Sequence, residues 1–184
     1  MKTQFAKSVV AALPLACAAF LGSCATSGAS DSAKVLATAG LADGTGKPVG
    51  MARIEQIGST LRLVADVNGI APGDHGIHLH ATGKCEAPAF ASAGGHLNPA
   101  SHQHGSLNPA GPHLGDLPNV TVGADGKGTL AFVIAGTAAE VAASLFDADG
   151  TAVVVHASAD DYKTDPSGNS GGRIACGVFN RPST

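Results

Sequence analysis

The chain has no tryptophan, only one tyrosine and only two methionines among its 184 residues. Glycine and proline are frequent instead, at 25 and 10 residues, and this composition favours a turn-rich fold with many short elements. Neither sign of charge dominates, because 11 lysines and arginines stand against 14 aspartates and glutamates. This balance argues against a nucleic acid or an anionic membrane surface as a partner. The length fits a single domain with a hydrophobic core.

The apolar run near the start of the chain is too short to cross a bilayer. It covers thirteen uncharged residues, 9–21, after Lys2 and Lys7. We predict a signal peptide over residues 1–23 and export to a bacterial periplasm or cell envelope. Leu21-Gly22-Ser23-Cys24 resembles the lipobox of bacterial lipoproteins, which would make Cys24 a lipidated N-terminus and the only membrane anchor. Ordinary cleavage nearby, which would release a soluble protein, is the alternative.

The four cysteines divide into two groups. Cys17 lies in the apolar signal segment and Cys24 at the proposed lipid site, which leaves Cys85 and Cys176 as one even pair. An oxidising compartment would allow that pair to join. Removal of residues 1–23 takes two lysines away, so the mature chain has nine positive against fourteen negative residues, a net charge of −5.

Residues 24–33 are mostly small and are predicted to form a flexible tether ahead of a domain over residues 34–184. Short stretches with strand character follow, and several alternate apolar and polar residues as antiparallel strands do. The predicted strands are 34–41, 48–57, 60–67, 76–80, 120–122, 128–135, 151–157 and 173–179. Turn residues lie between some of them, at Pro72-Gly73, Asp125-Gly126 and Asp149-Gly150, and residues 138–144 could form one helical turn.

Two segments, 80–120 and 160–172, have little strand pattern. Long loops inside a compact domain are usually functional or disordered, and the first of these contains candidate metal ligands. We therefore predict an all-β sandwich or barrel whose strands present two ordered loops.

Seven of the eight histidines lie in short motifs, and six of them form a set that could hold two metal ions. Imidazole is the usual nitrogen ligand of copper and zinc, and one carboxylate suits zinc as a fourth donor. The motifs are Gly-Ile-His78-Leu-His80, Gly-Gly-His96-Leu-Asn-Pro, His102-Gln-His104-Gly, Pro-His113-Leu-Gly-Asp116 and Val-Val-Val-His156. On a strand His78 and His80 point to one face, although alone the pair could be a solvated face. Asp116 alone could cap a turn, so the prediction depends on the coincidence of several motifs.

These motifs, with Val-Val-His-Ala-Ser-Ala-Asp-Asp and Gly-Gly-Arg-Ile-Ala-Cys-Gly-Val, resemble copper/zinc superoxide dismutase, in order, over residues 34–180. The resemblance implies an eight-stranded Greek-key β-barrel or sandwich with two long functional loops, an architecture of which this enzyme is a known example. It also implies one copper and one zinc per subunit.

The same resemblance assigns the ligands. It implies copper bound by His78, His80, His96 and His156, and zinc bound by His96, His104, His113 and Asp116. Two four-coordinate ions need eight donor positions and seven residues are available, so one residue must bridge. The resemblance implies that this is His96, as an imidazolate, because it lies in the family's bridging motif. Spacing alone does not choose between His102 and His104, but the family's histidine-glycine order selects His104. His102 and His75 are then expected at the surface.

Further roles follow from the resemblance. Asp160 matches a carboxylate that hydrogen-bonds one ligand of each metal, with an exposed loop acid as the alternative. Cys85 and Cys176 match an intrachain disulfide, and Arg173 matches the guanidinium near the copper. Lys163 is the one lysine left in the shortened 160–172 loop as a candidate second guide for the substrate.

The implied activity is the dismutation of superoxide to O₂ and hydrogen peroxide, with His96 and Arg173 as catalytic residues. A positive site would attract the superoxide anion against the negative charge of the protein as a whole, and electrostatic steering is a known property of this enzyme. A monomer and a homodimer are both compatible with the sequence. The alternatives are a non-catalytic lipoprotein that buffers copper and zinc, and an envelope domain whose metals only stabilise it. Neither would need Arg173 beside an open copper face.

Overall fold

The computed structural model describes residues 1–2 and 32–182. The chain divides into Met1–Ser30 and a compact unit, Asp31–Thr184, which carries the fold. The predicted signal peptide, Cys24 and most of the predicted tether lie outside the described residues. Among the residues that are described, no helix is long and apolar enough to cross a membrane.

The described part of the chain is built mainly of nine β-strands. They are β1 (Lys34–Asp43), β2 (Pro48–Ile57), β3 (Thr60–Asn68), β4 (Gly73–His75), β5 (Ile77–His80), β6 (Val120–Val122), β7 (Lys127–Ile134), β8 (Ala152–His156) and β9 (Arg173–Val178). Each of the eight predicted strands is present with its ends within two residues of the prediction. The additional strand is β4, three residues long, at the predicted Pro72-Gly73 turn.

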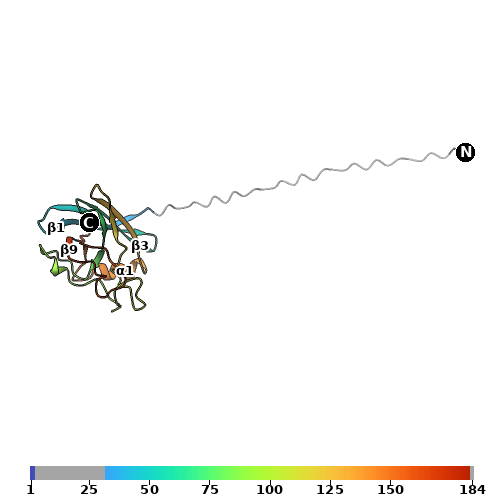
Figure 1. Ribbon diagram of the computed structural model, residues 1–184. Coiled ribbons are helices and arrows are strands. Elements are labelled where there is room, and N and C mark those ends of the chain that lie inside the picture. Colours follow the sequence, from blue (N-terminus) through green and yellow to red (C-terminus); the bar gives the residue numbers. More distant parts are fainter. Residues whose placement is uncertain (3–31, 183–184) are drawn as a thin grey trace. The chain divides into compact units, whose positions relative to one another are not determined.

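The strands close into a barrel. Seven form one antiparallel sheet in the order β5-β8-β9-β1-β2-β3-β7, and β4 pairs with β6 in a second sheet. β4 continues into β5 through Gly76, and Gly128 of β7 lies against Thr121 of β6. The second sheet therefore joins the two ends of the first, which confirms the predicted Greek-key barrel or sandwich. In the view of Figure 1 the strands labelled β1, β3 and β9 lie above the connecting loops.

The core lies inside the barrel, and β5 and β8 are buried on both faces. Their inner faces carry apolar residues such as Leu79 and Val155, whereas their outer faces are covered by the two long loops. A continuous apolar run such as Val153-Val154-Val155 is typical of a strand covered on both sides. The outer faces of β5 and β8 are where the histidines gather.

Two local features hold the connections in place. The helix α1 (Ala138–Leu145) begins with a capping box between Thr137 and Glu140 and buries Val141 and Leu145. The predicted disulfide between Cys85 and Cys176 is confirmed, and it joins the loop after β5 to β9 across 91 residues. Chain-entropy arguments give about 4 kcal/mol of stabilisation for closing a loop of this length.

Candidate metal centre

β5 and β8 present three of the histidines at one place. His78 and His80 are two residues apart on β5, so both side chains leave its outer face. β8 pairs with β5 from Ile77↔Val155 to His80↔Ala152. His156, the last residue of β8, donates its backbone N–H to Gly76 O at 2.8 Å, immediately before β5. The strand pairing therefore brings the third imidazole to the first two.

The loop after β5 folds back along that strand and adds the remaining ligands. Leu97 N–H donates to Leu79 O at 2.8 Å, and Leu79 N–H donates to Gly115 O at 2.9 Å. As a result His96 pairs with His80, and Asp116 pairs with His78, in isolated β-bridges. The positions of the predicted ligands are therefore set by backbone pairing to one strand.

The predicted copper ligands converge on one point. They offer one ring nitrogen each, all within 4.8 Å of one another. These atoms are His78 Nδ1, His80 Nε2, His96 Nε2 and His156 Nε2, and each is buried without a hydrogen-bond partner among the described residues. An unpaired buried polar atom is costly, and four at one point are explained by a shared cation. The donor set fits copper or zinc, both of which imidazole binds.

The second nitrogen of each of these rings is fixed by a neighbour. His78 Nε2 donates to Asp160 Oδ2 at 2.7 Å, and His96 Nδ1 lies 2.9 Å from Asp116 Oδ1. The remaining two rings are held by carbonyls, His80 Nδ1 by Gly94 O at 3.0 Å and His156 Nδ1 by Gly171 O at 3.1 Å. Such contacts set the ring orientation and the tautomer, so the unpaired nitrogen of each ring is the one free to bind a metal.

The predicted zinc ligands form a tighter group around Asp116. Its Oδ1 lies 2.9 Å from His96 Nδ1, 3.0 Å from His104 Nδ1 and 3.1 Å from His113 Nδ1. Tetrahedral zinc with bonds of about 2.0–2.1 Å requires donors about 3.3 Å apart, so the group has the size of a zinc site. Three nitrogens and one carboxylate oxygen are also a donor set that zinc prefers.

Asp160 connects the two groups from outside. Its side chain is buried, and while Oδ2 accepts from His78, Oδ1 accepts from His104 Nε2 at 3.0 Å. Asn119 fixes Asp160 in turn, because its amide bonds both the backbone N–H and the carbonyl of Asp160. Asp160 therefore accepts one hydrogen bond from a member of each group, and it is buried rather than exposed in its loop.

Burial and neighbouring charges perturb the pKa values in opposite directions. Burial lowers the pKa of His80 to about 2 and those of His96 and His156 to about 4, so these rings are neutral at pH 7. Burial also opposes a charge on His104, but hydrogen bonds to Asp116 and Asp160 outweigh it and raise that pKa to about 9. Neutral His80 and His156 can bind a metal without first losing a proton, whereas His104 must release one.

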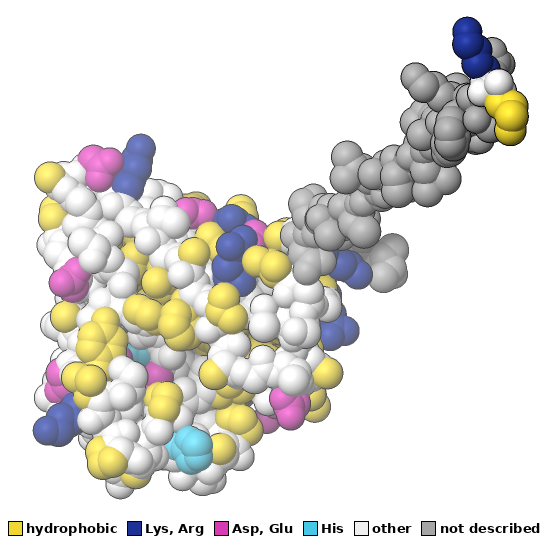
Figure 2. Space-filling view, turned by 90° about the vertical axis from the view of Figure 1, so that its right-hand side faces the viewer, with side chains coloured by type: hydrophobic (Ala, Val, Ile, Leu, Met, Phe, Trp, Pro, Cys, Tyr) yellow, Lys and Arg dark blue, Asp and Glu magenta, His cyan; other side chains and the backbone are white. Residues whose placement is uncertain are grey.

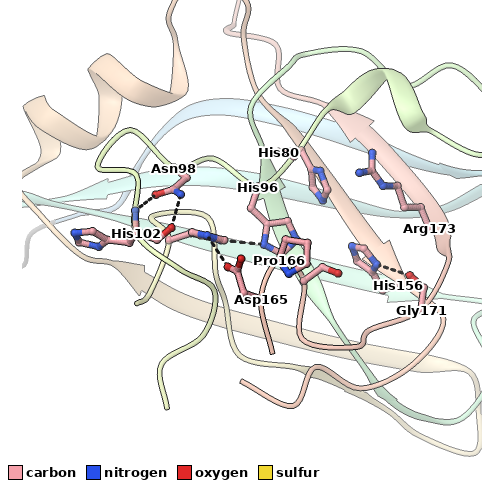
Figure 3. A pocket seen from close by; sticks show the side chains of 12 residues that line it. His80, His96, Asn98, His102, His156, Asp165, Pro166, Gly171 and Arg173 are labelled. Atoms are coloured by element: carbon pink, nitrogen blue, oxygen red, sulfur yellow. Dashed lines mark hydrogen bonds and ion pairs between the residues drawn. The ribbon is translucent and has the colours of Figure 1, made fainter. Parts of the chain in front are cut away.

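A cleft of about 450 Å³ opens onto the predicted copper ligands (Figure 3). His80, His96 and His156 line it together with Arg173. Arg173 is held by two carbonyls of the disulfide-linked loop, Phe90 O at 2.7 Å and Gly94 O at 2.6 Å. It is the only residue with a permanent positive charge among the described residues that line the cleft.

The position of one histidine was predicted wrongly, and one acid that lines the cleft was not predicted. His75 was expected at the surface but is buried, because its two ring nitrogens bond the carbonyls of His156 and Ala71 at 2.8 and 2.9 Å. His102 is exposed, as expected. Lys163 is exposed and is not among the residues that line the cleft. Asp165 lines the cleft, and no sequence pattern had singled it out.

Charged side chains of both signs are scattered over the face shown in Figure 2, and little histidine is visible there. This agrees with the burial of seven of the eight histidines, all except His102. The two groups of predicted metal ligands therefore lie beneath the surface, and solvent reaches them through the cleft.

Comparison with known proteins agrees with this geometry. The family described as copper/zinc superoxide dismutase (SODC) matches residues 49–179. Copper/zinc superoxide dismutase 2 of Aquifex aeolicus is 40% identical over 156 residues, which cover 82% of this chain and 90% of the relative. The Caulobacter vibrioides enzyme is 40% identical over 78% of this chain and 84% of its own. The crystal structure of a SOD-like protein from Bacillus subtilis superposes with a TM-score of 0.73 at 40% identity, covering 79% of this chain and 99% of that one.

Proposed function

This chain belongs to the copper/zinc superoxide dismutase family, and we propose on that premise how its residues perform the reaction. The enzyme is an oxidoreductase that converts two superoxide anions and two protons into O₂ and hydrogen peroxide. The proposed ligands are those of the two groups described above. His78, His80, His96 and His156 would hold copper, and His96, His104, His113 and Asp116 would hold zinc.

When bound, copper supplies a one-electron redox couple, and zinc supplies a redox-silent positive charge that organises the loop. The observation that best supports this proposal is the convergence of four unpaired, buried imidazole nitrogens on one point next to a cleft. His96 belongs to both groups, with Nε2 in one and Nδ1 in the other, so it is the bridging residue.

Arg173 binds and orients the substrate. The carbonyls of Phe90 and Gly94 fix its guanidinium, which remains charged beside the cleft that admits superoxide. A positive charge focused in a cleft raises the association rate of an anion by about tenfold or more at low salt. The net charge of the mature chain is negative, so this local field is what directs the substrate to the site.

His96 moves one of the two protons. Its Nε2 is buried, has no hydrogen-bond partner among the described residues and belongs to a ring that lines the cleft. A proton carried on Nε2 would therefore lie beside the path of the substrate. We assign to this atom one of the two protons that end on hydrogen peroxide, while the other comes from solvent.

Reconstitution tests these assignments. Purified protein loaded with copper and zinc should contain one of each per chain and remove superoxide. His156→Ala should lose copper and activity while it keeps zinc, whereas His102→Ala, which changes an exposed histidine of the same loop system, should keep both metals. Activity that survives copper removal would contradict the proposal.

We also propose that residues 1–23 form a cleaved signal peptide, that Cys24 is the lipidated first residue of a tether 24–33, and that the catalytic domain is 34–184. The support is the charge pattern and lipobox-like sequence before Cys24, which lies outside the described residues, together with a disulfide that needs an oxidising compartment. Mass spectrometry of the mature N-terminus decides whether Cys24 is acylated. Sedimentation of the loaded enzyme distinguishes a monomer from a homodimer.

A further inference from the structure

We propose that Asp165 is a positioning residue for the zinc ligands, and that its negative charge slows the approach of superoxide to the cleft. The inference builds on the proposed zinc site and assigns a role to a residue outside both ligand sets. One carboxylate has two effects. It holds the loop that carries His104 and His113, and it faces the path of the substrate.

Asp165 contacts His104 and His113, two of the three histidines among the proposed zinc ligands. Its Oδ1 accepts a hydrogen bond from the backbone N–H of His104 at 2.6 Å, and the same oxygen lies 3.9 Å from His113 Nε2. The carboxylate therefore links the 160–172 loop to the loop after β5. The link is made at His104 and His113, whose Nδ1 atoms face Asp116.

Each of the three histidines around Asp116 has a second ring nitrogen that faces away from Asp116. That of His113, Nε2, has the least support from neighbouring residues apart from Asp165. The second nitrogen of His104 bonds Asp160, and that of His96 is one of the predicted copper-binding nitrogens. Among the described residues, Asp165 is the acid within ion-pair distance of His113 Nε2. Metal-bound histidines almost always direct their second N–H to a carboxylate, a carbonyl or water, and loss of such a partner typically weakens metal binding 10- to 100-fold.

The chain holds Asp165 in place through the turn that precedes it. The carboxylate of Asp161 accepts from the backbone N–H groups of Lys163 and Thr164 and from the side-chain amide of Asn169. This bracing fixes both sides of Asp165 in the sequence. The short loop therefore presents the carboxylate toward His104 rather than leaving it free in solvent.

The position of Asp165 is unfavourable for catalysis by charge alone. Its side chain is 48% exposed and lines the same cleft as Arg173. Figure 3 shows the two residues on opposite sides of His96 and His156, and no ion pair between them is found among the described residues. A carboxylate that is not paired with Arg173 opposes the steering of an anion into this cleft, and zinc positioning accounts for its presence.

Asp165→Asn separates the two effects, because asparagine keeps an oxygen for the His104 N–H and removes the charge. We expect zinc release to a chromophoric chelator to become about tenfold faster, while copper release is unchanged. At low ionic strength kcat/KM for superoxide should rise about twofold, and the gain should vanish at about 1 M salt. Asp125→Asn, an equal charge change at an exposed turn residue outside the cleft, should alter none of these values.

Asp165→Glu retains the charge and should keep kcat/KM at the wild-type value while it restores part of the zinc retention. The inference fails if Asp165→Asn releases zinc at the wild-type rate, or if kcat/KM does not rise. Faster loss of both metals with lower thermal stability and no gain in kcat/KM would identify a merely structural loop residue and also overturn it. Wild-type protein that takes up no zinc in the same assay would instead refute the proposed function.

Discussion

Asp160 is the residue whose removal should weaken both metal sites at once. Its two carboxylate oxygens accept from His78 Nε2 at 2.7 Å and from His104 Nε2 at 3.0 Å, one ring in each ligand set. Burial opposes its ionisation, but the hydrogen bonds from His104 and His78 outweigh that effect and hold its pKa below the usual range. It is therefore a carboxylate at neutral pH. Asp160→Asn keeps the shape and turns one acceptor oxygen into a donor NH₂.

The expected loss follows from that geometry. Asparagine can still accept from one imidazole, but its NH₂ faces the N–H of the other. One hydrogen bond to a charged group is then lost in a buried place, which costs about 1.5–3 kcal/mol. Loss of an outer partner of a metal-bound histidine typically lowers affinity 10- to 100-fold, or about 1.4–2.8 kcal/mol. The two estimates agree, so we expect the affinity for copper, zinc or both to fall 10- to 100-fold.

Competition with chelators of graded affinity measures this effect separately for each metal. The matched control is Asp149→Asn, which removes the same charge from an exposed acid whose side chain makes no hydrogen bond or ion pair among the described residues. The control should bind both metals like the wild type. If Asp160→Asn also binds both metals within twofold of the wild type, the idea that this carboxylate orients the two rings is refuted.

Three further predictions follow from the same geometry. Arg173→Ala should keep both metals but lower kcat/KM at least tenfold and flatten its dependence on ionic strength, and stopped-flow assays that find neither change would contradict its steering role. Cys85→Ser with Cys176→Ser should lower the free energy of unfolding in urea by up to about 4 kcal/mol, and a loss under 1 kcal/mol would show that loop closure matters little. Metal-free protein should be most stable near pH 6.5. The pKa of His156 is lowered to about 4 by burial, so stability falls as pH drops from 6.5 toward 4. The pKa of His104 is raised to about 9 by its carboxylates despite burial, so stability also falls as pH rises from 6.5 through 9, and urea midpoints that do not vary with pH would refute both shifts.

The strands could be predicted because their signals are local. In β2 buried Ala52 and Ile54 alternate with the more exposed Met51 and Arg53, and the predicted bounds of 48–57 are those observed. The short strand β4 has no such signal. Pro72-Gly73 indicates a turn, and Gly73–His75 become a strand only because β6, nearly fifty residues later, provides the pairing partner.

His75 shows a second limit of local reasoning. A histidine in a Gly-Asp-His-Gly sequence is expected in solvent, yet His75 is buried because His156 O and Ala71 O satisfy both ring nitrogens. A polar side chain can be buried when each of its polar atoms has a partner, and those partners come from the tertiary fold. Asp165 was missed for the same reason, since nothing in the sequence distinguishes it from Asp161.

The spacing of the metal motifs has its origin in the backbone rather than in the ligands. Gly115 lies between Leu79 and Leu97, with its N–H donating to Leu97 O at 2.9 Å and its carbonyl accepting from Leu79 N–H at 2.9 Å. A side chain at Gly115 would collide with Leu79 O, and backbone cannot move aside as a flexible side chain can. Leu79 stands between the two histidines of β5, Leu97 follows His96, and Gly115 precedes Asp116, so any shift at this crossing displaces members of both ligand sets together. The two sets therefore form one structural unit, and His-Leu-Gly-Asp is a packing motif as well as a ligand motif.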